Sequence, residues 1–269
     1  MIGMSGRLRL VVGLDSLGRC ALREQFNSQL HRVLHLIPGG APEEGLVYLL
    51  NPTGGIVQGD DLEAEIRVEG GAHAIVTSPS ATRIYGMDRG EAASRTRLRV
   101  GPGSVLEYLP EPLIPYAGAR FLEDLDLEAE PGARALAWEI LSPGRLARGE
   151  SLAYDRLEFR LQVKEGVRTV LRERSVIVPA GGLGNPVVLS RFTHYGILIT
   201  IGGDPGEVER AARSAVGTAF AGATRLRGSA VVVKILADEL REITALFDRL
   251  RGAVIPVLAG RRATPLRRT

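Results

Sequence analysis

Four strand–turn–strand units follow one another through the middle of the chain, and they limit the fold more than any other feature. In "LEAEIRV", residues 62–68, apolar and charged residues alternate, which is typical of a strand with one buried face. "EGG" then turns the chain and "AHAIVTS" returns. The pattern recurs in "RTRLRV-GPG-SVLEYL", "LDLEAE-PG-ARALAWEI" and "LEFRLQV-KEG-VRTVLRE". The turn glycines lie roughly thirty residues apart, at Gly71, Gly103, Gly132 and Gly166.

A single hairpin cannot bury its apolar face, so such units are expected to stack around a continuous core. We therefore predict a mainly β fold of stacked antiparallel hairpins in a β-helix-like arrangement, with half-solvated sheets. Two α-helices are predicted near the C-terminus. One follows the candidate N-cap Asp204 and Pro205, and the other covers residues 238–253. No low-complexity linker interrupts the chain, which predicts a single domain over residues 1–269.

The composition excludes several classes of protein. The 34 basic and 31 acidic residues give a net charge of only +3, which lacks the excess typical of nucleic-acid binding. No run of about 18 apolar residues predicts a membrane span, and the first residues make a poor signal peptide. The single cysteine, Cys20, excludes a disulfide framework, so we expect a cytoplasmic protein. The basic tail "GRRATPLRRT" is interpreted as a solvated terminus, with a binding arm as the alternative.

The stretch "NPTGGIVQGDDL", residues 51–62, is rich in glycine but does not match a phosphate-binding loop. Asp60 and Asp61 stand where such a loop needs a lysine and a hydroxyl, and two carboxylates repel phosphate. We interpret the stretch as a tight turn in which Gly54, Gly55 and Gly59 meet unusual φ angles or close packing. The turn then delivers Asp60 to the inside of the β stack.

No catalytic motif stands out in the sequence. His31 and His35 are four residues apart, but without a third ligand we interpret them as ordinary packing rather than a metal site. The acids Asp60, Glu139 and Glu173 are better candidates for a functional site. A carboxylate that points inward from a strand is costly unless it is ion-paired, bound to a metal or hydrated. For each acid alone, an ion pair with one of the many arginines is the simpler interpretation.

Five ordered blocks resemble the urease accessory protein D family, which is called H in some bacteria. They are "LLNPTGGIVQGDDL", "AIVTSPSATRIY", "VLEYLPEPLIPYAGA", "LAWEILSPGRLARGE" and "VLRERS". The match covers about Leu49 to Arg174 well and the C-terminal part more loosely. Arg83, Tyr108 and Asn51 stand where the family pattern has Lys, Trp and His.

The resemblance implies a scaffold for metal delivery rather than a catalyst. Members of that family bind apo-urease and the accessory proteins F and G, the latter a GTPase that carries nickel. They pass nickel through an internal channel, and the matching polar positions here are Asp60, Thr82, Glu139 and Glu173. Oxygen ligands hold Ni²⁺ weakly compared with His or Cys, which suits transit. We therefore expect transient Ni²⁺ contacts at Asp60, Glu139 and Glu173 and no permanently bound cofactor.

Two other functions stay open on the residues alone. One is a β-solenoid hydrolase or lyase acting on carbohydrate, with Asp60, Glu139 and Glu173 as acid and base. The other is a protein-interaction module whose acids all form surface ion pairs. The segment "LPEPLIPYAGARF" is a candidate partner surface through Leu113, Ile114 and Tyr116, or an edge loop packed on its own domain.

Overall fold

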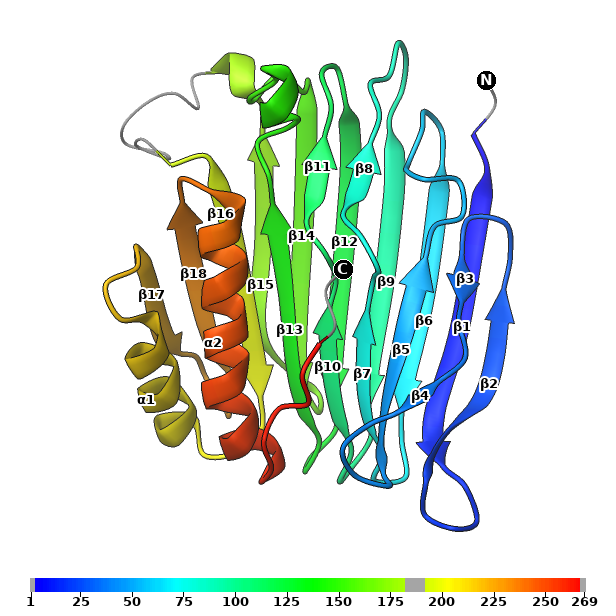
Figure 1. Ribbon diagram of the computed structural model, residues 1–269, viewed down its shortest axis with the longest axis vertical. Helices are drawn as coiled ribbons and strands as arrows, with labels where there is room; N and C mark the ends of the chain where they lie inside the picture. The colour runs from blue at the N-terminus through cyan, green and yellow to red at the C-terminus, as the bar shows by residue number, and fades with distance from the viewer. Residues whose placement is uncertain (1–2, 182–191, 267–269) are drawn as a thin grey trace.

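Two β-sheets face one another, and the chain passes from one to the other at successive turns (Figure 1). The structure is a computed structural model that describes residues 3–181 and 192–266. The seven-stranded sheet contains β1 (Ser5–Leu14), β2 (Cys20–Asn27), β6 (Asp61–Val68), β9 (Ala92–Val100), β12 (Arg120–Ala129), β14 (Arg156–Glu165) and β15 (Arg168–Ile177). The eleven-stranded sheet contains β3 (Arg32–Val33), β4 (Ile37–Pro38), β5 (Glu44–Leu50), β7 (His73–Thr77), β8 (Thr82–Ile84), β10 (Val105–Leu109), β11 (Leu113–Pro115), β13 (Arg134–Leu141), β16 (His194–Ile201), β17 (Ala221–Arg225) and β18 (Val231–Ala237).

The mainly β, β-helix-like prediction is confirmed, but three of the four predicted hairpins are not hairpins. The turns at Gly71, Gly103 and Gly132 each join a strand of one sheet to a strand of the other. β6, β9, β12 and β14 then pair in parallel with one another, as do β7, β10 and β13. Only the turn at Gly166 closes an antiparallel hairpin, between β14 and β15. An alternating pattern specifies which face of a strand is buried, and both arrangements bury the same face.

The two C-terminal helices are confirmed, and they cover β13, β16, β17 and β18 at one end of the eleven-stranded sheet (Figure 1). In α1 (Pro205–Val216), the Asp204 side chain caps the helix by accepting from the backbone N–H of Glu207 at 2.7 Å. α2 (Leu240–Ala259) is longer than predicted. Among the described residues, no helix is long and apolar enough to cross a membrane.

Strands β13, β16 and β18 of the eleven-stranded sheet are buried on both faces, because one face packs on the helices and the other on the seven-stranded sheet. Along β13, Leu136, Trp138 and Ile140 pack toward the helices. Ala135 and Ala137 pack into the core between the sheets. Glu139 is in phase with these two alanines, so period-two alternation places its carboxylate between the sheets.

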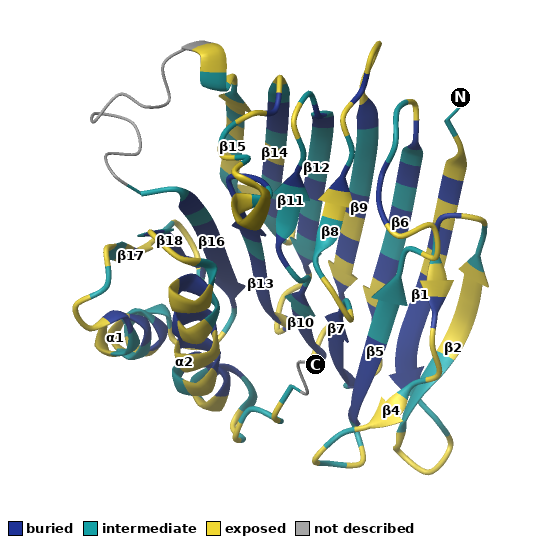
Figure 2. Cartoon of the chain, turned by 45° about the horizontal axis from the view of Figure 1, so that its top comes forward, coloured by how far each residue is buried: buried dark blue, intermediate teal, exposed yellow. Residues whose placement is uncertain are grey.

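The outer face of the seven-stranded sheet carries alternating columns of acids and bases. Figure 2 shows the banding of buried and solvent-facing residues along these strands. The acids of β6 pair with the arginines of β9, for example Arg99 with Glu65 at 3.0 Å. The acids of β12 pair with the next strand, where Lys164 reaches Glu128 at 2.7 Å. Parallel in-register stacking aligns like residues, so complementary columns keep most like charges from facing one another, although Arg67 is in register with Arg99.

The described part of the basic C-terminal tail is held against the body of the protein. Arg251 of α2 bonds the buried carboxylate of Glu107 and donates to the backbone carbonyl of Thr264 at 2.6 Å. The hydroxyl of Thr264 donates to Glu44. This segment is therefore anchored at Thr264 rather than free, although Arg262 and Pro265 remain exposed to solvent. Residues 267–269, which complete the predicted tail, lie outside the described residues.

Candidate functional site

The loop between β5 and β6 depends on its glycines. Gly54 and Gly59 each have φ of +79°, a left-handed conformation that side chains rarely adopt. Gly55 is packed so closely that an added Cβ would lie 2.5 Å from the ring of Tyr85. Asn51 closes the loop by donating from its side-chain amide to the carbonyl of Gly55 at 3.1 Å. The loop is thus a compact turn.

Asp60 follows this turn and is only 2% exposed, but its carboxylate is used by the backbone. Oδ1 accepts the N–H of Met4 at 3.0 Å, and Oδ2 accepts the N–H of Val57 at 2.9 Å. Asp60 therefore joins its own loop to the start of the chain. It does not line the cavities that contain Glu139. The structure thus does not bring together the three acids Asp60, Glu139 and Glu173.

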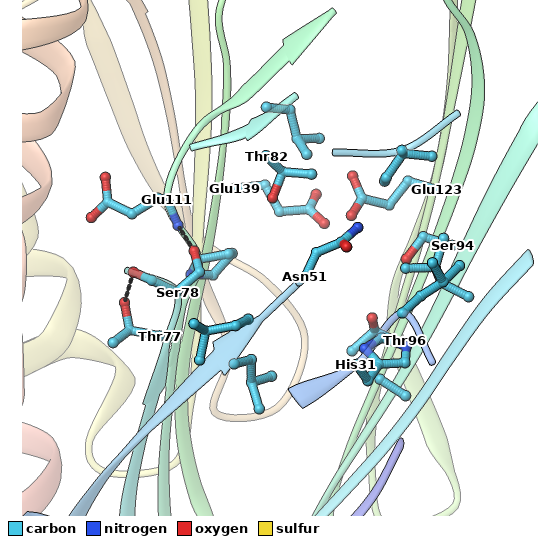
Figure 3. Close-up of a pocket in the computed structure, with 18 of the residues that line it drawn as sticks. His31, Asn51, Thr77, Ser78, Thr82, Ser94, Thr96, Glu111, Glu123 and Glu139 are labelled. Atoms are coloured by element: carbon cyan, nitrogen blue, oxygen red, sulfur yellow. Dashed lines mark hydrogen bonds between the residues drawn. The ribbon is translucent and has the colours of Figure 1, made fainter. Parts of the chain in front are cut away.

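A cavity of about 120 Å³ lies between the two sheets, and we call it the Glu123 cavity. Figure 3 shows the carboxylates of Glu123 and Glu139 pointing toward one another inside it. Both sheets and their connecting segments supply further polar lining groups, including His31, Asn51, Thr82, Ser94 and Thr96. Leu113 of the proline-rich segment also lines it, which makes this part of the segment a packed wall rather than a free surface.

A second cavity of about 380 Å³ adjoins the first, and we call it the Lys234 cavity. It contains the ion pair between Lys234 and Glu173, in which Nζ donates to both carboxylate oxygens at 2.8 Å and 2.7 Å. Glu139, Ile140 and Leu113 line both cavities. Glu139 therefore stands at the boundary between the two spaces.

Burial and mutual repulsion make these carboxyl groups hard to ionise. Burial, with a further contribution from Glu173, raises the pKa of Glu139 to about 7. Burial and the nearby Glu139 raise the pKa of Glu123 well above its ordinary value. Oε2 of Glu123 is buried and has no hydrogen-bond partner among the described residues. Glu123, Glu139 and Glu173 thus form an electrostatically linked series.

The two histidines considered as a metal pair are separated by the fold. His31 lines the Glu123 cavity, and burial lowers its pKa to about 4, so the imidazole is neutral at pH 7. His35 is solvent-exposed and does not line that cavity. Within the described ranges, no group of three or more His, Cys, Asp or Glu side chains is arranged to hold a metal ion.

The comparisons with known proteins agree on one family. A family model described as UreD urease accessory protein matches residues 4–269. The chain belongs to the UreD family of urease accessory proteins. It is 34% identical over 265 residues to the urease accessory protein UreD of Pseudomonas putida strain W619, covering 97% of this chain and 91% of that protein.

Two further UreD relatives come from other organisms. The Haloarcula marismortui protein is 36% identical over 210 residues, which cover 76% of this chain and 70% of that protein. The Actinomyces naeslundii protein is 29% identical over 255 residues, which cover 90% of this chain and 91% of that protein. Membership of the UreD family implies a role in urease maturation, together with urease and other accessory proteins, rather than catalysis.

Sequence reasoning on this UreD family member missed Glu123. In "FLEDLDLEA", Phe121, Leu125 and Leu127 are buried, and Glu123 falls in the same alternation. The sequence could have indicated Glu123, because this acid occupies a position that the alternation assigns to the buried, apolar face of the strand. Of the predicted positions, Thr82 and Glu139 do line the Glu123 cavity, whereas Glu173 lines the Lys234 cavity.

Proposed function

We propose that this UreD family member conducts Ni²⁺ through the space between its two sheets during urease maturation. The observation that carries the proposal is that Glu139 lines both the Glu123 cavity and the Lys234 cavity. An ion moving between these cavities has to pass this carboxylate. Thr82 and Glu123 are then further contact points on one side of Glu139, and Glu173 on the other.

The chemistry of the lining suits passage rather than storage. The polar groups are mainly carboxylate and hydroxyl oxygens, which bind Ni²⁺ less tightly than thiolate or several imidazoles. A conducted ion must both enter and leave, so weak contacts at successive positions are favourable. Because the pKa of Glu139 is about 7, an arriving cation displaces the proton from the carboxyl group and is then attracted by the negative charge of the carboxylate.

We further propose that the chain acts as a scaffold in the cytoplasm, where it bridges apo-urease to a complex of accessory proteins F and G. The family membership supports this assignment of partners. The conduction proposal also needs it, because an ion that leaves the cavities requires a donor on one side and an acceptor on the other. No nucleic-acid or membrane partner enters the proposal.

The carbohydrate-directed hydrolase that the sequence left open has no support in the geometry. That function needs Asp60, Glu139 and Glu173 around one substrate bond. Asp60 is bonded to two backbone amides and lines neither cavity, and Glu173 is paired with Lys234. We therefore do not carry this candidate further.

The test is to produce the chain together with apo-urease and accessory proteins F and G, and to measure the nickel content of the purified urease. Glu139→Gln keeps the shape of the side chain but removes its charge, so we expect the complex to form and nickel loading to fall. Glu128→Gln is the matched control, because Glu128 lies on the outer face and pairs with Lys164. Normal nickel loading by Glu139→Gln in an intact complex would refute the conduction proposal.

A further inference from the structure

Lys234 is unusual among the basic residues of this protein. The chain has only two lysines, Lys164 and Lys234. Lys164 lies on the outer face of the seven-stranded sheet and belongs to the charge columns described above. Among the described residues that line the two cavities, Lys234 is the only lysine or arginine.

The position of Lys234 in its strand directs it between the sheets. In β18, Val231, Val233 and Ile235 pack toward the helices, whereas Val232 packs into the core between the sheets. Lys234 shares the phase of Val232 and therefore faces the seven-stranded sheet. There it meets Glu173 of β15, so this ion pair links the edge strand of the seven-stranded sheet to β18, which is next to the edge of the eleven-stranded sheet.

Lys234 also lies in the same row of the eleven-stranded sheet as Glu139. Glu139 is in register with Ile197 of β16, and Ile197 is in register with Lys234. Two strand spacings separate the backbones of Glu139 and Lys234, which is roughly 10 Å. The ammonium group thus lies in the same row of the sheet as the boundary carboxylate, two strands away, and is held there by Glu173.

Stability alone does not explain a lysine at this position. The side chains of Lys234 and Glu173 are 48% and 25% exposed, and ion pairs exposed to this degree contribute little to folding. The ammonium nevertheless occupies both oxygens of Glu173, where a cation contacting that carboxylate would bind. Lysine is a point charge on a flexible stem, so it can leave the carboxylate without moving the backbone.

We propose that Lys234 is a resident counter-cation that occupies Glu173 until a divalent cation displaces it. Lys234 thereby limits how tightly the path retains a metal ion, and it discriminates against monovalent ions. A monovalent ion exchanges one positive charge for another on Glu173, whereas a divalent ion brings twice the charge and gains attraction. This inference rests on the proposed conduction of Ni²⁺ past Glu139.

The test measures Ni²⁺ binding to the full-length chain by competition with a chromophoric chelator. Lys234→Met removes the ammonium group that competes with Ni²⁺ for Glu173. We therefore expect Ni²⁺ to bind about fivefold more tightly than to the wild type, equivalent to about 1 kcal/mol. Lys234→Arg keeps a cation on Glu173 and should not bind Ni²⁺ more tightly than the wild type. Lys164→Met is the matched control, since it breaks a lysine–glutamate pair of the same length on the outer face.

A second pair of variants keeps the test valid if Lys234→Met changes the fold. In a Glu173→Gln background the competitor has lost its partner carboxylate, so adding Lys234→Met should no longer tighten Ni²⁺ binding. Tightening of the same size in both backgrounds would overturn the inference, because Lys234 would then act without Glu173. Thermal unfolding of each variant identifies any that are not folded.

The outcomes separate this inference from the conduction proposal. If Lys234→Met and wild type bind Ni²⁺ equally while Glu139→Gln lowers nickel loading of urease, the counter-cation is refuted and conduction stands. If Glu139→Gln loads urease normally, conduction itself is refuted, whatever Lys234→Met does. Tighter Ni²⁺ binding by Lys234→Met, together with slower nickel delivery to urease, supports both.

Discussion

Glu123 of β12 and Glu139 of β13 point toward one another across the space between the two sheets (Figure 3). They belong to consecutive strands, but the turn at Gly132 sends those strands into different sheets. Each acid therefore faces the other rather than solvent, and burial keeps their pKa values raised. Two carboxyl groups held this close, with no basic partner among the residues that the structure describes, cost stability, which points to a role for the pair.

Glu123→Gln is expected to slow nickel delivery to urease without unfolding the protein. The amide keeps the side-chain volume but removes one anionic contact, which we expect to cost about 1.5 kcal/mol, or roughly tenfold in rate. The measurement is the nickel content of urease against time. Asp124→Asn is the matched control, since Asp124 lies on the same strand but on the outer face. Equal slowing by both variants would contradict a specific role for Glu123.

The stability of the protein should depend on pH through Glu139. Its pKa is about 7 in the folded protein against an ordinary 4.5, so the folded state holds the proton more tightly than the unfolded state. The contribution of protonated Glu139 to the free energy of unfolding is fully present below about pH 4.5 and is lost as the pH rises through 7. Its size is on the order of 3 kcal/mol.

Glu139→Gln cannot ionise, so this variant should become more stable relative to wild type as the pH rises from 5 to 8. Urea unfolding at several pH values measures the difference. A constant difference across that range would show that Glu139 ionises as readily in the folded protein as in the unfolded chain. The same variant is also expected to deliver less nickel to urease. At high pH it should therefore be more stable than the wild type but less active.

Asp60→Ala is expected to destabilise the fold rather than act on the cavities. The substitution leaves the N–H groups of Met4 and Val57 without their side-chain acceptor, and because both hydrogen bonds are only partly buried we expect about 1–3 kcal/mol in total. Asp61→Ala is the adjacent control, because it breaks a partly exposed pair with Arg95 worth up to about 1 kcal/mol. Chemical denaturation of both variants tests this. Equal losses would show that the Asp60 bonds contribute no more than a surface pair.

Arg251→Met is expected to be the most destabilising of these substitutions. Arg251 is 4% exposed and bonds the fully buried Glu107, so its removal leaves a buried carboxylate whose remaining hydrogen bond among the described residues is to the ring of His73. Breaking a buried pair from one side costs about 3–5 kcal/mol. Arg249→Met, on the exposed side of the same helix, should change the unfolding free energy by less than about 0.5 kcal/mol.

Much of the local structure followed from sequence patterns that need no distant partner. The alternation in "LEAEIRV" predicted β6, and Asp204 with Pro205 predicted the start of α1. The glycines of the loop after β5 indicated a tight turn, and Gly54 and Gly59 adopt left-handed angles there. These features depend on residues within a few positions, whose steric and hydrogen-bonding preferences are encoded locally.

The tertiary structure decided which strands pair and which acids meet. A strand that buries one face does so equally well in a hairpin or in an arch between two sheets, so alternation alone did not distinguish them. The site depends on that choice. The arch at Gly132 brings Glu123 opposite Glu139, and the packing of the two sheets brings Lys234 onto Glu173. Asp60 instead bonds the backbone of Met4, just before β1. The charge and protonation of each acid are set by groups from the opposite sheet, whose proximity arises only when the sheets pack.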